Sequence, residues 1–140
     1  MIQLIDDMVT EMQTNEEFVL GFEFTGEFDI KIVEEFVNLV RPKLNASEKT
    51  LNLFCKIDQA DFSHITLKSF LDNQWIDIIK TFNPENGKKI HRVAVVGNSD
   101  FEKKLVEADA FFAKLWNKNI DERYFKINDI DKAWDFVLEA

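Results

Sequence analysis

The strongest constraint on the fold is a repeated switch between two apolar periods along the 140 residues. Segments in which every second residue is apolar have the period of a β-strand, and they alternate with segments whose apolar residues recur at intervals of three and four, as in an amphipathic helix. The strand pattern covers residues 18–24, 51–57 and 124–127, the helix pattern covers residues 30–44, 67–82, 100–116 and 129–140, and residues 93–96 are apolar throughout. Such a continuous apolar run indicates a central strand covered on both faces.

A weaker strand pattern lies between Ile2 and Met12, before a turn at residues 14–17. We therefore expect an antiparallel pair at the start, followed by strand–helix crossovers onto one sheet. The predicted fold is α/β, a mostly parallel sheet with an antiparallel N-terminal edge strand and four helices, in a single domain over residues 1–140. The strand that starts at Phe18 is expected to bury one face. Only four Gly and two Pro argue against an all-β chain of many tight turns.

Local signals mark the helix ends. Asp29 is the expected N-cap of the first helix, and Pro42 is expected to close or kink its last turn. Ser99 with Glu102 forms a capping box, which starts the third helix after Gly97. A phosphate-binding loop at this turn is disfavoured, because the turn has neither a glycine-rich fingerprint nor a Gly-Lys-Ser/Thr sequence.

The negative charge is concentrated at one end of the chain. The formal net charge of −9 arises within residues 1–36, which hold ten acidic residues and Lys31, while the rest is balanced. Most of these carboxylates are expected to form a solvated face, although a surface that attracts cations or a basic partner is a second interpretation. A nucleic-acid partner is not expected, since such binding needs a basic surface. A basic cluster, Lys80, Lys88, Lys89 and Arg92, surrounds the turn at residues 83–87 and is the part of the chain suited to an anionic membrane.

Residues suited to catalysis or metal binding are isolated. The one cysteine, Cys55, shares a strand face with apolar residues and is expected to be buried and inert. His64 and His91 have no second His or Cys at ligand spacing, so we expect no metal site and no cofactor. Asp61, Ser63 and His64 are close in sequence, but no nucleophile motif accompanies them, so the protein is expected not to be an enzyme.

Targeting signals are not evident in the sequence. The N-terminus has no basic and apolar leader pattern, and no apolar run approaches the ~18 residues of a transmembrane helix. A cytoplasmic location is therefore expected.

Aromatic residues are unusually frequent, with 14 Phe, 3 Trp and 1 Tyr. The apolar stripe of residues 67–82 is wider than one sheet face usually covers, and the helix at residues 100–116 adds further aromatic side chains. This surplus indicates a nonpolar pocket, a partner interface or ordinary core. The candidate pocket residues are Phe62, Leu67, Phe70, Leu71, Trp75, Ile78, Phe112 and Trp116.

Several segments together resemble a known family. They are residues 91–102 with the run Val-Ala-Val-Val-Gly-Asn-Ser-Asp, then Arg123-Tyr124-Phe125, then Ala133-Trp134, and more loosely residues 22–26. They resemble the SpoIIAA-like branch of the STAS superfamily over nearly the whole chain. The resemblance implies a STAS-type fold, also similar to CRAL-TRIO domains, and a non-enzymatic protein that binds a nonpolar small molecule, associates with membranes and forms a homodimer.

The chain departs from the STAS pattern at one functional position. Anti-sigma-factor antagonists carry an adjacent Asp-Ser pair at a helix N-terminus, where the serine is phosphorylated. The corresponding residues 58–64 hold no such pair, and Ser63 follows a phenylalanine. The alternative to a ligand-binding module is therefore a regulatory protein that acts through protein–protein contacts without this phosphorylation site.

Overall fold

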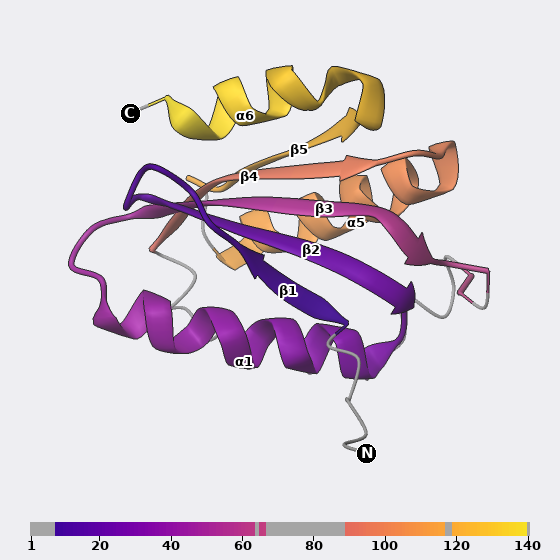
Figure 1. The fold of residues 1–140 in the computed structure, drawn as a ribbon, viewed down its shortest axis with the longest axis horizontal. Helices are drawn as coiled ribbons and strands as arrows, with labels where there is room; N and C mark the ends of the chain where they lie inside the picture. Colours follow the sequence, from indigo (N-terminus) through magenta and orange to yellow (C-terminus); the bar gives the residue numbers. More distant parts are fainter. Residues whose placement is uncertain (1–7, 64, 67–88, 117–118, 140) are drawn as a thin grey trace, which may run out of the picture.

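The computed structural model describes residues 8–63, 65–66, 89–116 and 119–139. A mixed sheet of five strands in the order β1-β2-β3-β4-β5 forms its middle layer (Figure 1). The short strand β1 (Val9–Met12) pairs antiparallel with β2 (Val19–Glu27). Three parallel neighbours follow, β3 (Leu51–Asp61), β4 (Ile90–Gly97) and β5 (Asp121–Lys126). The predicted antiparallel edge strand and mostly parallel sheet are confirmed.

The described residues contain three α-helices: α1 (Ile30–Ala46), α5 (Asp100–Trp116) and α6 (Ile130–Leu138), the last preceded by a 3₁₀ turn at Ile127–Asp129. Helices α1 and α5 lie on one face of the sheet and α6 lies on the other (Figure 1). The helix expected at residues 67–82 falls outside the described part of the chain, so three of the four predicted helices are observed.

The sheet buries apolar side chains on both faces, in two clusters. Phe22 and Leu53 pack in the cluster beneath α1 and α5, while Val19 and Phe54 pack in the cluster beneath α6. Val19 is 1% exposed, so the prediction that this strand buries one face was wrong. The sequence of β2 alternates because Gly21 and Glu23, which are not apolar, follow Val19 on the α6 face.

Helix α1 begins as its sequence predicts but ends later. The Asp29 side chain accepts hydrogen bonds from the backbone N–H groups of Lys31 and Ile32, at 2.9 and 3.1 Å, as an N-cap does. The helix continues past Pro42 to Ala46 rather than closing there. Pro42 lies on the exposed side of the helix, where solvent can replace the helical hydrogen bond that a proline cannot donate. At the other end of the chain, Leu138, the last residue of α6, is 41% exposed.

Asn52 joins three elements at the amino end of the sheet. It is buried, its N–H donates to the Phe18 carbonyl, and its Nδ2 donates to the Val137 carbonyl in α6 at 2.8 Å. Its Oδ1 accepts the Arg92 N–H at 2.9 Å, where an irregularity interrupts the β3–β4 ladder. One amide side chain therefore replaces a missing ladder bond and holds the last turn of α6.

Two members of the predicted basic cluster bind helix ends instead of forming a free surface. The Lys89 ammonium donates to the carbonyls of Leu44 and Ser47, at the end of α1. The Arg92 guanidinium donates to the Phe136 carbonyl and to the Glu139 carboxylate, at the end of α6. Cations stabilise helix C-termini because these carry partial negative charge. The other two members, Lys80 and Lys88, lie outside the described residues.

Candidate functional site

The carboxyl ends of parallel strands are the usual place for a ligand in an α/β sheet. Phe62, which follows β3 at this edge, is half-buried and stacks on Phe28, with ring centroids 4.6 Å apart and planes 24° apart. It is the one predicted pocket residue whose side chain the structure describes. Leu67, Phe70, Leu71, Trp75 and Ile78 lie outside the described residues, as do the side chains of Phe112 and Trp116 on α5.

Strand pairing brings the two rings together. Glu27 and Asp61 are register partners at the ends of β2 and β3, and the next residue, Phe28, donates its N–H to the Asp61 carbonyl at 2.7 Å. The Asp61 carboxylate accepts the Ser63 N–H at 2.9 Å and so turns the chain at Phe62. The stack is therefore held by a backbone–backbone bond beside Phe28 and by a bond from the backbone to a side chain beside Phe62.

The stack is the outer end of a continuous series of phenylalanine rings. Ring centroids are 5.2 Å apart for Phe22 and Phe36, 5.3 Å for Phe36 and Phe24, and 6.5 Å for Phe24 and Phe28. The series runs from Phe22, which is 0% exposed, to the half-buried Phe28 and Phe62. We call these five residues the phenylalanine ladder. Its outer rings offer apolar and polarisable surface, which suits nonpolar ligands.

The turn from β4 to α5 is closed by polar contacts, and the predicted capping box is confirmed. Ser99 Oγ accepts the Glu102 N–H at 3.1 Å and donates to the Glu102 carboxylate at 2.6 Å, while that carboxylate also accepts the Asn98 N–H. The Tyr124 hydroxyl accepts the Ser99 N–H and donates to the Ser99 carbonyl. The protein's own carboxylate thus occupies the helix N-terminus, where anions otherwise bind.

Gly97 and Tyr124 show how tightly this turn is packed. A Cβ on Gly97 would lie 2.6 Å from Glu102 Oε1 and 2.8 Å from a Tyr124 ring carbon, so a larger residue there would have to displace both side chains. Burial raises the pKa of the Tyr124 phenol, and the nearby acidic side chains Glu102 and Asp100 add to this effect. The contact between Tyr124 and Ser99 joins residues 25 apart, which sequence patterns do not reveal.

An ion network lies on the α6 face of β2 and β3. Lys56 Nζ is 2.8 Å from Asp58 Oδ1 and 3.4 Å from Glu23 Oε2, and Glu23 and Lys56 are register partners. Burial alone would lower the pKa of Lys56, but the two carboxylates outweigh it and the pKa is raised. Burial would likewise raise the pKa of Asp58, but hydrogen bonds from Lys56 and Gln59 lower it. The network is a cross-strand contact that sequence analysis missed.

Several carboxylates of the acidic N-terminal segment have internal partners. Glu11 pairs with Lys43 at 2.9 Å, Glu23 pairs with Lys56, and Glu35 accepts the Val9 N–H at 3.2 Å. Together with the helix cap Asp29, these residues bind within the fold. Most of the described carboxylates of the segment are nevertheless exposed, as expected for a solvated face: Glu11, Glu16, Glu17, Glu27 and Glu34.

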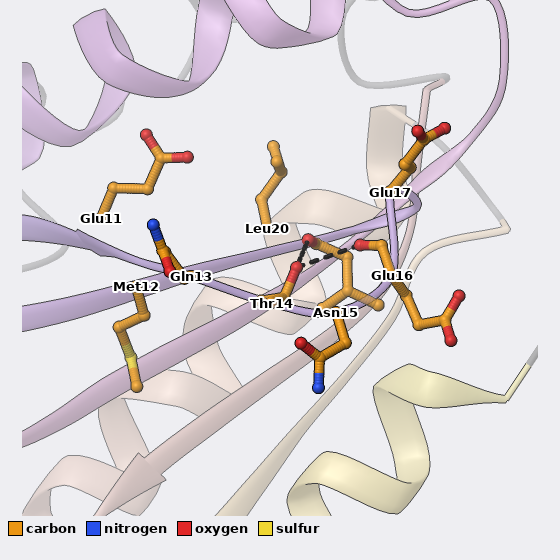
Figure 2. Close-up of a pocket in the computed structure, with 9 residues that line it drawn as sticks. Glu11, Met12, Gln13, Thr14, Asn15, Glu16, Glu17 and Leu20 are labelled. Atoms are coloured by element: carbon orange, nitrogen blue, oxygen red, sulfur yellow. Dashed lines mark hydrogen bonds between the residues drawn. The ribbon is translucent and has the colours of Figure 1, made fainter.

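Two surface hollows flank the hairpin between β1 and β2, at the opposite end of the sheet from the ladder. Figure 2 shows the first, of about 600 Å³, where the Thr14 hydroxyl bonds the carbonyls of Glu16 and Val19. The second, of about 590 Å³, shares Glu16 and Glu17 with it and extends to Leu51. The exposed carboxylates at 16 and 17 give this end of the molecule a negative surface.

The remaining candidates from the sequence have ordinary environments. Cys55 is 6% exposed in the core, as predicted, and His91 is exposed on β4, while His64 lies outside the described residues. Across the described ranges, the acidic, histidine and cysteine side chains form no group of three suited to a metal ion. In the same ranges, no helix has the length and apolar character needed to cross a membrane.

Comparisons with known proteins place the chain in a structural context. Residues 19–138 match the SpoIIAA-like family model. The chain is similar to an uncharacterised protein from Shewanella loihica PV-4 with a SpoIIAA-like fold, whose crystal structure aligns with a TM-score of 0.56 over 92% of this chain and 91% of that one, at 16% identity. No curated protein matches the sequence.

Proposed function

The chain belongs to the SpoIIAA-like family, and we propose that it is a non-catalytic binding module that holds a nonpolar, lipid-like small molecule against the phenylalanine ladder. The observation that carries this proposal is the half-buried stack of Phe28 and Phe62 at the carboxyl end of the sheet. Rings that are packed on one side and partly exposed on the other gain free energy when a nonpolar ligand covers them.

Peripheral membrane contact and homodimer formation stay predictions that accompany this function. The predicted pocket residues Leu67, Phe70, Leu71, Trp75 and Ile78 belong to the same proposal, because residues 67–82 follow Phe62 closely in the chain. The predicted residues Phe112 and Trp116 on α5 belong to it as well.

A fluorescent fatty acid tests the proposal directly. We expect the full chain to bind cis-parinaric acid, and we expect Phe62→Ala to weaken this binding about tenfold or more, since burial of one such side chain contributes about 1.5–3 kcal/mol. The measurement is a fluorescence titration, together with mass spectrometry of a solvent extract of the purified protein.

Phe125→Ala is the matched control. Phe125 is also half-buried, but it lies on the α6 face, with its ring centroid 5.8 Å from that of Phe136. We expect its removal to leave probe binding unchanged. A clean extract with no probe uptake would contradict the proposal, and so would an equal loss of binding in both variants.

A second candidate function is regulation through a protein partner, and the exposed Glu16 and Glu17 beside the two hollows favour it. A partner with a basic surface would bind there and would be released by salt. The test is capture from a cell lysate with the unmodified chain and with the Glu16→Lys/Glu17→Lys variant. If the unmodified chain and the variant captured the same amount of partner protein, or if salt did not release that partner, this candidate function would be rejected.

A further inference from the structure

The phenylalanine ladder changes its packing from its buried end to its outer end. The angle between ring planes is 86° for Phe22 and Phe36, 46° for Phe36 and Phe24, 38° for Phe24 and Phe28, and 24° for Phe28 and Phe62. The buried end is therefore an edge-to-face contact, whereas the outer end is a face-to-face stack. Among the rings that the structure describes, Phe28 alone stacks on Phe62, so the ladder ends at a ring with one stacked neighbour.

The face-to-face contact at the outer end determines what can extend the ladder. Phe62 is half-buried, so part of its ring is in contact with solvent. A ring in such a stack uses one of its two faces, and a second planar group can lie parallel to the other. Offset stacked rings gain interaction energy beyond the burial of their area. A saturated chain covers the same area without this gain, so the outer end of the ladder favours a planar π-system.

Backbone contacts hold the Phe62 ring in place before any ligand binds. The Phe28 N–H donates to the Asp61 carbonyl, and the Asp61 carboxylate accepts the Ser63 N–H. The Ile65 N–H donates to the Phe62 carbonyl at 3.1 Å. These bonds fix the turn on both sides of Phe62, so less conformational entropy is lost when a ligand covers the ring.

We propose that the ligand of this site carries a planar π-system, either an aromatic ring or a conjugated chain, which stacks on Phe62 and extends the phenylalanine ladder by one member. This inference rests on the proposed function, because it names the class of nonpolar molecule that the same site would take. Phe62 is then the residue that sets specificity, since its ring distinguishes an unsaturated ligand from a saturated one of equal size.

Two matched pairs of fatty acids test the proposal by isothermal titration calorimetry of the full chain. The first pair is ω-phenyldecanoic acid and ω-cyclohexyldecanoic acid, and the second is cis-parinaric acid and stearic acid. The members of each pair have the same number of carbon atoms. We expect the phenyl or conjugated member to bind about three- to tenfold more tightly than its saturated partner. Burial alone predicts the opposite order or no difference, because the saturated member has at least as much apolar area.

The two pairs also distinguish the sources of the π-system. A preference in the phenyl pair alone assigns an aromatic ring, and a preference in the parinaric pair alone assigns a conjugated chain. If all four acids bind and neither pair shows a preference, the proposed function stands and this inference is overturned. If none of the four binds, the proposed function itself fails.

The variant Phe62→Leu separates stacking from burial, because leucine is apolar but has no ring. It should bring the affinities within each pair to within about twofold of each other, while the saturated members bind within about threefold of their affinity for the unmodified chain. Phe125→Leu is the control, since the Phe125 ring is also half-buried but lies on the α6 face. It should leave the preference unchanged. A preference that survives Phe62→Leu, or that Phe125→Leu removes equally, overturns the proposal.

Nuclear magnetic resonance of the unmodified chain decides the question if Phe62→Leu does not fold. Intermolecular nuclear Overhauser effects should join the Phe62 ring protons to the π-system of each preferred acid. The ring current of Phe62 should also shift the proton signals of that π-system upfield. A bound, preferred acid without these contacts to Phe62 overturns the proposal.

Discussion

Two turns at the same edge of the sheet have opposite chemistry. The turn from β2 to α1 carries Phe28, which stacks on Phe62 and leaves apolar ring surface partly exposed. The turn from β4 to α5 is closed by the carboxylate of Glu102 and the hydroxyl of Tyr124. Position at the carboxyl edge therefore does not define a binding site by itself. The side chains that follow each strand decide whether its turn exposes apolar surface or is filled from within.

The largest expected change in stability is at the turn from β4 to α5. Gly97→Ala forces Glu102 and Tyr124 away from their hydrogen-bond partners, and it should lower the free energy of unfolding by about 2–4 kcal/mol, the sum of overpacking and a lost helix cap. Urea unfolding measures the change. The neighbouring Asn98→Ala keeps the backbone N–H and should cost less than about 0.5 kcal/mol. A Gly97→Ala variant as stable as Asn98→Ala would show that the turn is not tightly packed.

A smaller change in stability is expected at Gly26, which precedes the turn from β2 to α1. Gly26 has a φ of 81°, and the nearest atoms to an added Cβ are those of the Met8 side chain, at 3.7 Å. Gly26→Ala should therefore cost about 1–2 kcal/mol through backbone conformation alone. Gly26→Asn should recover part of this loss, because asparagine tolerates the left-handed region. If Gly26→Ala lowered the free energy of unfolding as much as Gly97→Ala does, both turns would have no room for an added methyl group.

The smallest effect is a change in titration. Burial raises the pKa of Tyr124, the one tyrosine in the chain, so its phenolate absorbance should appear at higher pH in the folded protein than in urea. Because the folded state favours the neutral phenol, its stabilising contribution is complete below about pH 10 and is lost as the pH rises through the folded pKa. Tyr124→Phe should remove the absorbance change. Equal titration midpoints of Tyr124 in the folded chain and in urea would contradict an effect of burial on the pKa of its phenol.

Features of the two turns that depend on local sequence could be predicted. Asp29 and the Ser99–Glu102 pair cap their helices as expected, because a cap involves residues only two or three apart. The apolar patterns likewise predicted the strands and the mixed sheet, although the alternation in β2 indicated one buried face and the structure buries both.

Features that depend on strand register could not be predicted. The stack of Phe28 on Phe62 joins the ends of two paired strands, and no period in the sequence indicates that contact. Lys89 and Arg92 looked like a surface cluster because the helix ends that they bind are more than 40 residues away. Charge patterns alone do not distinguish a free cation from one that caps a distant helix.

Lys89 and Arg92 also have a consequence for how the fold opens. They lie three residues apart at the start of β4, yet the helices whose ends they hold lie on opposite faces of the sheet. Fraying at this one point would release both helix termini together. The two outer layers are thereby coupled into a single cooperative unit, although the sheet lies between them.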